Sequence, residues 1–244
     1  MTWVNVLWCF ISCSALYQVL FYLPIYFQSI HGQSAIISGV NSIPFLAFFA
    51  VGAVASGTVI QNTRFLQPYE LISALMITAG MALLYTLDIN SSKARYVEAE
   101  VLLGFGVGFG NQIPMTAVQG LSKLEDVAST TGIMFMALSG SAVDFIVVAQ
   151  SIFANRILQT LKATAPHLNP GLVLSTGASD LHHVFSGDDL AAVLNAYMTG
   201  IKDVFACSLA CAAFAVLLAL IIPLKKLPNH DSKKTEAEEK VATV

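Results

Sequence analysis

Three polar side chains recur along one face of an otherwise apolar segment near the middle of the chain. Gln112, Thr116 and Gln119 follow one another at helical spacing, and Asn111 lies beside them. Amides and hydroxyls are costly in hydrocarbon unless they have partners. The stripe therefore predicts either hydrogen bonds between helices or the wall of a watery solute path. We expect the path, with Pro114 as a flexible point because proline removes a backbone donor.

A second apolar segment, near the N-terminus, carries a similar mixture. Tyr17 and Gln18 interrupt it at a depth where neither is expected to serve only as an interfacial anchor. We expect both side chains to face the same solute pathway. Pro24 lies inside this segment and is expected to provide a second flexible point.

One carboxylate stands out because of its depth in an apolar segment. Asp144 falls near the middle of a long apolar run, where a charge costs at least about 2.5–3.5 kcal/mol. Two interpretations stay open: a proton-relay group or counter-charge for a solute, or a neutral acid bonded to Ser141 or a nearby amide. Glu98 and Glu100 open another apolar segment, and we expect them to be boundary residues that favour a helix N-terminus.

Glycines are expected to let helices approach closely. Gly104 with Gly108, and Gly106 with Gly110, form two overlapping GxxxG pairs on opposite faces of one helix. Gly140 adds a small residue to the segment that carries Asp144. The glycine run lies within an apolar segment and follows no strand, so it predicts packing and not a nucleotide site.

Other chemistries find little support. The four cysteines form two i, i+4 pairs inside apolar segments, and the five histidines fall outside them. These positions give neither the spacing of zinc ligands nor a nucleophile with a base at membrane depth. We therefore expect no metal, no cofactor and no catalytic residue. The net charge of −3 comes without a basic stripe, which argues against a nucleic-acid partner.

Composition places these residues in a membrane. The 244 residues are 56% hydrophobic and 11% charged, with a mean hydropathy of +0.71, whereas soluble domains carry about 25% charge. The sequence predicts an all-α integral membrane protein, a bundle of six transmembrane helices of about 20 residues or more. The expected spans are 4–28, 36–60, 68–87, 96–119, 127–153 and 199–223.

The remaining segments are expected outside the bilayer. Residues 154–198 predict an excursion with short helices, one of them capped by Ser186. Residues 224–244 are charged, lack large apolar residues apart from leucine near their start, and predict a disordered cytosolic tail. The distribution of lysine and arginine favours both termini in the cytosol and the excursion on the opposite side.

The residues also resemble a known family in their order and spacing. The chain is similar to the C-terminal half of a fungal fourteen-helix drug:proton antiporter of the major facilitator superfamily, in the group of toxin and multidrug efflux pumps. The segments that carry the resemblance are YLPIYFQSIHGQSAIISGVNSIP (22–44), LLYTLDINSS (83–92), LLGFGVGFGNQIPMTAVQ (102–119), DVASTTGIMFMALSGSAVDFIVVAQSIFANRI (126–157) and GASDLHHVFSGDDLAAVLNAY (177–197).

The resemblance implies one half of the family fold, built from two inverted three-helix repeats. The first and fourth spans would line a central cavity, the second and fifth would gate it, and the third and sixth would lie outside. It implies efflux of small amphipathic compounds, toxins or secondary metabolites by proton antiport. The bilayer, the solute and protons are the implied partners, and the plasma membrane is the expected location, with the vacuolar membrane as the alternative.

The chain also departs from the family pattern. The family's antiporter signatures belong to its N-terminal half, and Asp144 stands where the family typically has a small residue. We therefore expect a transporter truncated to its C-terminal half. The alternatives are a non-transporting half-transporter, which forms a homodimer or pairs with an N-terminal half, and an inactive remnant.

Overall fold

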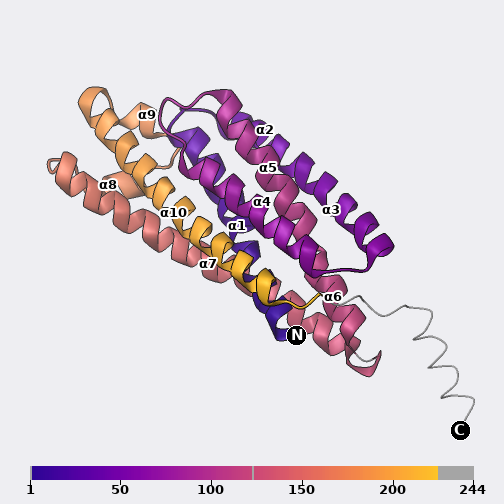
Figure 1. Ribbon diagram of the computed structural model, residues 1–244. Coiled ribbons are helices and arrows are strands. Elements are labelled where there is room, and N and C mark those ends of the chain that lie inside the picture. Colours follow the sequence, from indigo (N-terminus) through magenta and orange to yellow (C-terminus); the bar gives the residue numbers. More distant parts are fainter. Residues whose placement is uncertain (1, 123, 225–244) are drawn as a thin grey trace, which may run out of the picture.

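Six long helical spans make up the computed structural model, which describes residues 2–122 and 124–224 (Figure 1). Within these residues, each span is long and apolar enough to cross a membrane, which confirms the predicted six-span bundle. The helices are α1 (Thr2–Ser29), α2 (Ala35–Asn41), α3 (Ile43–Thr63), α4 (Gln67–Tyr85), α5 (Lys93–Asn111), α6 (Ile113–Leu121), α7 (Val127–Thr164), α8 (Pro170–Ser175), α9 (Leu181–Val184) and α10 (Gly187–Ile221). A 3₁₀ turn, Leu124–Asp126, precedes α7.

Two spans are broken at a proline. Ser42 separates α2 from α3, with Pro44 in the first turn of α3. Gln112 separates α5 from α6, with Pro114 in the first turn of α6. Pro24, in contrast, lies inside a continuous α1, and its carbonyl accepts a hydrogen bond from Ser38 Oγ at 3.0 Å. That the helices flex at Pro24 and Pro114 stays a prediction.

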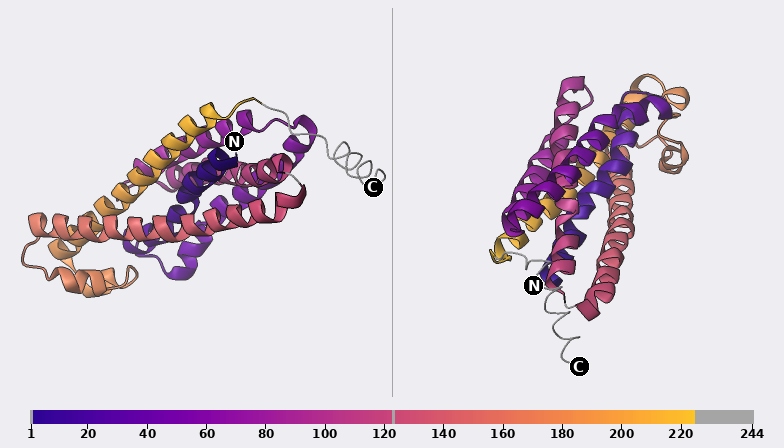
Figure 2. Two further views of the ribbon diagram at one scale, coloured as in Figure 1. Left: turned by 90° about the horizontal axis from the view of Figure 1, so that it is seen from below. Right: turned by 90° about the vertical axis from the view of Figure 1, so that its right-hand side faces the viewer.

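The helices pack as two inverted three-helix repeats. In one repeat α1 is followed by α2–α3 and α4, and in the other α5–α6 is followed by α7 and α10. α1 packs against α7 and α10 of the second repeat, while α5 packs against α3 and α4 of the first, and α4 packs against α10 (Figures 1 and 2). Each repeat thus places its first helix against the second and third helices of the other, which is the predicted architecture.

Glycines line the contact between α5 and α3. A Cβ on Gly104 would lie within 3.0 Å of the Phe45 carbonyl oxygen, and a Cβ on Gly108 would meet the Phe49 carbonyl in the same way. Gly52 of α3 faces the backbone of α5 equally closely. Helices in a bilayer associate chiefly through such close packing of small residues. The two backbones are therefore held together by positions that tolerate no side chain.

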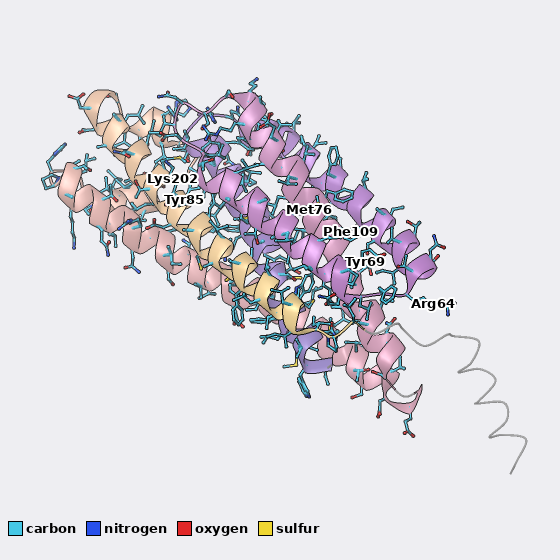
Figure 3. The ribbon with its side chains drawn as sticks, viewed as in Figure 1. Arg64, Tyr69, Met76, Tyr85, Phe109 and Lys202 are labelled. Carbon is cyan, nitrogen blue, oxygen red and sulfur yellow. The ribbon has the colours of Figure 1, made fainter. Side chains whose placement is uncertain are left out.

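The opposite face of α5 packs against α4. Gly106 approaches Met76, and Ser73 Oγ donates a 2.8 Å hydrogen bond to the Gly106 carbonyl. Gly110 lies against Ser73 and the ring of Trp8. Toward the start of α4, the rings of Tyr69 and Phe109 meet edge to face with centroids 6.0 Å apart (Figure 3). Gly140 of α7 differs, because its nearest neighbour is the side chain of Phe10 at an ordinary 3.7 Å.

The predicted bounds of the 154–198 excursion differ from the structure. α7 continues to Thr164 and α10 already begins at Gly187, so only 165–186, with α8 and α9, connects them at the end of the bundle opposite the N-terminus (Figure 2). Ile157 and Leu161 of α7 are fully buried there, and Arg156 forms a 2.7 Å ion pair with Asp203 of α10. The end of α7 after residue 153 and the start of α10 before residue 199 carry polar residues on their outer faces. These residues lower the average hydropathy, so the average does not reveal the buried apolar face.

Two smaller expectations also fall in this part of the chain. Ser186 occupies the N-cap position of α10, but its side chain makes no capping hydrogen bond. The predicted capped helix is therefore the beginning of α10 and not a separate element. Apart from Leu224, the predicted tail lies outside the described residues.

The contact between α5 and α3 generates a stability prediction. Replacing Gly108 with alanine should destabilise the folded chain by about 1–3 kcal/mol, because the new methyl group would meet the α3 backbone. Thermal unfolding in detergent, followed by size-exclusion chromatography, would measure the loss. Gly57→Ala is the matched control, since nothing lies within 4 Å of a Cβ at that position. Equal melting of the two variants would contradict the proposed role of Gly108.

Candidate solute pathway

The predicted polar stripe lies at and after the break between α5 and α6. Gln112 and Gln119 are exposed and Thr116 is half-buried. Thr116 Oγ1 donates to the carbonyl of Gln112 at 3.0 Å, so its hydroxyl is engaged within its own helix. Among the described residues, the side chains of Gln112 and Gln119 have no hydrogen-bond partner, which leaves both amides available to whatever occupies this face.

Tyr17 joins α1 to this surface. It packs against a buried cluster that includes Cys13 and Met134 of α7, and Met115 of α6 and Leu138 of α7 pack against the same cluster. Further along α1, Leu20 and Phe21 are 41% and 48% exposed. α1, α6 and α7 therefore meet in a cluster of aromatic, sulfur-containing and aliphatic side chains. That Gln112 and Gln119 lie on the same face stays a prediction.

Gln18 lies elsewhere. Its side chain is fully buried between α1 and α10, where Oε1 accepts a hydrogen bond from Ser208 Oγ. Tyr17, its neighbour in the sequence, points about 100° away around the helix and is only half-buried. The expectation that Gln18 faces the pathway is therefore wrong for this structure, and the residue is part of the bundle interior.

Asn111 is half-buried at the end of α5. Its Oδ1 accepts a weak hydrogen bond from Cys13 Sγ at 3.9 Å. The residue also lines a small cavity together with Trp8, Ser12 and Gly110. Asn111 thus lies at the contact between α5 and α1, directly before the helix break at Gln112.

Asp144 is exposed on α7. Among the described residues it has neither a hydrogen-bond partner nor an ion-pair partner. Ser141, the expected neutral partner, donates instead to the carbonyl of Phe10 at 2.7 Å. The structure therefore does not contain the Asp144–Ser141 hydrogen bond, and the carboxyl group faces away from the bundle interior.

Two carboxylates that the sequence interpretation did not place in the interior are fully buried. Glu70 lies in the first turn of α4 and Glu100 lies in α5. Within the described part of the chain, none of their four oxygens makes a hydrogen bond. Glu100 is thus no boundary residue, and its spacing of one turn before Gly104 on the glycine face was the signal for its burial.

The end of the bundle opposite the N-terminus is held by polar contacts between connections. His182 of α9 donates from Nε2 to the carbonyl of Ser29 at 2.8 Å, which ties the 165–186 segment to the end of α1. The Tyr26 hydroxyl donates to the Asp88 carbonyl at 3.1 Å, and the Asp88 carboxylate lies 3.6 Å from Lys202 Nζ. Lys202 lies part-way along α10 and is labelled in Figure 3.

His31 belongs to the same set of contacts. Its Nε2 lies 3.2 Å from the Tyr26 hydroxyl oxygen, and it must act as the donor because that hydroxyl donates to Asp88. Burial, and then the charge of Lys93, lower the pKa of His31 below its ordinary value of 6.5. The folded state therefore favours the neutral imidazole.

Across residues 2–122 and 124–224, no three histidine, cysteine, aspartate or glutamate side chains gather closely enough to hold a metal ion. The polar groups that the structure does gather are amides, hydroxyls and single carboxyl groups. Such groups suit hydrogen bonding to an amphipathic solute and exchange of protons with water.

Comparison with known proteins identifies the family. No family model matches the chain. The chain is 66% identical over 242 residues to a dehydrocurvularin exporter of Aspergillus terreus, across 99% of this chain and 42% of that protein. It is 36% identical over 219 residues to the MFS-type transporter thnB of Trichoderma harzianum, across 89% of this chain and 38% of that one. The chain belongs to the major facilitator superfamily.

The fold agrees with this membership. The structure is similar to that of a bacterial homologue of the human lysosomal transporter Spinster, in an inward-facing and occupied conformation, with a TM-score of 0.65 at 15% identity. The match covers 90% of this chain and 48% of that one, and at this identity it shows the fold alone. The chain spans about two-fifths of the length of the relatives it matches. The resemblance to fungal efflux pumps is thereby confirmed.

The state of His31 generates a pH prediction. Because its pKa is lowered in the folded chain, the stability it contributes is complete above about pH 6.5 and declines as the pH falls below that value. We expect the melting temperature in detergent to fall on acidification, and His31→Gln to reduce the fall by a small but measurable amount. His183→Gln, at an exposed histidine near His182, is the control. Identical pH curves for wild type and His31→Gln would contradict the prediction.

Proposed function

We propose that this chain forms one half of an exporter that moves small amphipathic compounds, of the secondary-metabolite class, out of the cell in exchange for protons. The observation that carries the proposal is the 66% identity, over nearly the whole chain, to a protein named as a dehydrocurvularin exporter. Dehydrocurvularin is therefore the first solute to test. Proteins that share a fold can differ in substrate, so the proposal must also agree with the chemistry of the site.

The surface of α1, α6 and α7 has the chemistry that an amphipathic solute needs. Tyr17, Met115 and Phe21 offer apolar and aromatic area, while Gln112 and Gln119 offer both hydrogen-bond donors and acceptors. Unbranched methionine side chains adapt to varied shapes, which suits a broad range of solutes. In this proposal Asn111 and Thr116 support the wall from behind, and Asp144 takes part in proton coupling from α7.

The second wall of the path must come from outside the described residues. α2–α3 and α7 are the least buried spans of the structure, and large apolar side chains such as Val54, Met136 and Val143 are 63–79% exposed on them. The relatives are more than twice as long as the matched region. We propose that an N-terminal half-transporter packs against these two spans, and that a second copy of the chain is the alternative partner.

The proposed location is the plasma membrane, with the vacuolar membrane as the alternative. Multi-pass insertion follows from the six spans and the family. Both the start of α1 and the end of α10 lie at one end of the bundle (Figure 1). We propose that this end faces the cytosol, on the basis of the lysine and arginine bias.

The export proposal is tested by uptake into inside-out membrane vesicles that contain the chain together with an N-terminal half. In these vesicles the lumen corresponds to the outside of the cell. We expect dehydrocurvularin to accumulate when the lumen is more acidic than the medium, and accumulation to stop when a protonophore collapses this gradient. Accumulation that survives the protonophore would exclude antiport. Accumulation equal to that of empty vesicles would exclude export of this solute.

A substitution tests the position of the pathway. Gln112→Leu should change the apparent affinity for polar solutes by roughly fivefold or more, because one hydrogen-bonding amide contributes about 1 kcal/mol. The amount of protein in the membrane should stay constant, since the side chain bonds to no described residue. Gln159→Leu, an exposed glutamine near the end of α7, is the matched control. Unchanged transport by Gln112→Leu would remove this residue from the pathway.

A further inference from the structure

Glu100 is carried into the contact between α5 and α3. It lies one helical turn before Gly104 and two turns before Gly108, on the face whose glycines let the α3 backbone approach. The side chain is fully buried, and neither oxygen makes a hydrogen bond among the described residues. The Phe45 backbone packs against Gly104, one helical turn along α5 from Glu100, so the carboxyl group lies near the start of α3.

Phe45 belongs to a helix end that lacks a side-chain cap. α3 begins at Ile43, directly after the break at Ser42, and no side chain caps its first turn. The Ser42 hydroxyl points back to the carbonyl of Ser38 at 3.1 Å, and Pro44 has no N–H to offer. The first amides of a helix carry partial positive charge, which favours an anion at that place. Glu100 is the carboxylate that the fold brings there.

The two protonation states of Glu100 differ in what they do for α3. An ionised carboxylate is attracted to the N-terminus of α3, yet it is costly in a buried place without hydrogen bonds. A protonated carboxyl avoids that cost and loses most of the attraction. Binding of one proton from water to Glu100 therefore weakens the attraction that holds the N-terminus of α3, and no other reactant is needed.

We propose that Glu100 is a proton-binding residue that couples its protonation to the bend between α2 and α3. α2–α3 forms the second span, and the break at Ser42 and Pro44 is the joint at which its outer segment can tilt. The proposal goes beyond export of any particular solute. It assigns a proton-responsive role to a residue on the glycine face of α5, away from the polar stripe at Gln112.

The surroundings of Glu100 leave few other groups that titrate near neutral pH. α2, α3 and α6 contain no ionisable side chain. On α5, Tyr96 lies one turn away, and it meets Phe27 of α1 with ring centroids 4.8 Å apart. Tyrosine ordinarily titrates near pH 10. The other titratable side chains of α5 and its neighbours are Cys9, Cys13, Tyr17, Tyr22 and Tyr26 of α1, Tyr69, Glu70 and Tyr85 of α4, Lys93, Arg95 and Glu98 of α5 itself, and His31 and Asp88 in nearby connections.

Hydrogen exchange at the start of α3 tests the coupling. The chain is placed in lipid nanodiscs, and exchange of the amides of residues 45–48 is followed by mass spectrometry at about pH 5 and about pH 8, corrected for intrinsic rates. We expect roughly five- to tenfold stronger protection at the higher pH, the size that a charge at a partly buried helix end can provide. Glu100→Gln should show the weaker protection at both values.

Two controls separate Glu100 from its neighbours. Glu98→Gln removes an exposed carboxylate two residues away on α5, and His31→Gln removes the histidine nearest to α2. Both variants should keep the wild-type difference between the two pH values. Equal protection of the wild type at both values, or a difference that persists in Glu100→Gln, would overturn the proposal.

A second measurement stands if Glu100→Gln does not insert. Infrared spectra of the wild type should show the C=O stretching band of a protonated carboxylic acid that disappears on raising the pH. Glu100→Asp, which withdraws the carboxyl group from Phe45, should shift this band, and Glu70→Gln should leave a titrating band in place. A titrating band identical in wild type and Glu100→Asp would exclude Glu100. Neither readout involves solute, so the proposal can fail while export stands.

Discussion

The close contact of α5 with α3 and α4 is the constraint on which the rest of this bundle depends. Helices that already lie in lipid gain little from burying more apolar surface, so they associate through packing of small residues and a few polar contacts. Gly104 and Gly108 admit the backbone of α3, while Gly106 and Gly110 admit α4, with Ser73 bonded across to Gly106. This contact fixes α5, and with it the break at Gln112 and the amides that follow.

Polar groups in this bundle occupy three environments. Gln18 finds Ser208 inside the bundle, so it acts as a link between helices. Gln112 and Gln119 find no partner among the described residues and are exposed. Glu100 is buried at the unprotected start of α3. Membrane proteins tolerate polar groups in each environment at different cost, and the cost is highest for a buried carboxylate without a partner.

The arrangement of the two repeats leaves apolar surface exposed on α3 and α7. Each repeat places its first helix against the second and third helices of the other, so α3 has its main contact with α5, and α7 has its main contacts with α1 and α10. The spans that contain α3 and α7 are the least buried and carry large exposed apolar side chains. The relatives that match the chain continue for more than its own length. A second half on this face would bury the exposed side chains and supply the opposite wall.

The amino-acid sequence by itself determined the class and the plan of the protein. Six long apolar segments predict six spanning helices, because a helix satisfies the backbone hydrogen bonds of a single segment inside a bilayer. The ordered motifs indicated the efflux family. The polar stripe at Gln112 could be predicted because its spacing repeats every helical turn. Tertiary structure alone decided the direction of single polar residues: Tyr17 faces outward and Gln18 inward, Ser141 bonds to Phe10 and not to Asp144, and Glu100 is buried. Such choices depend on which neighbouring helix lies at each angle around the axis, and local sequence does not contain that information.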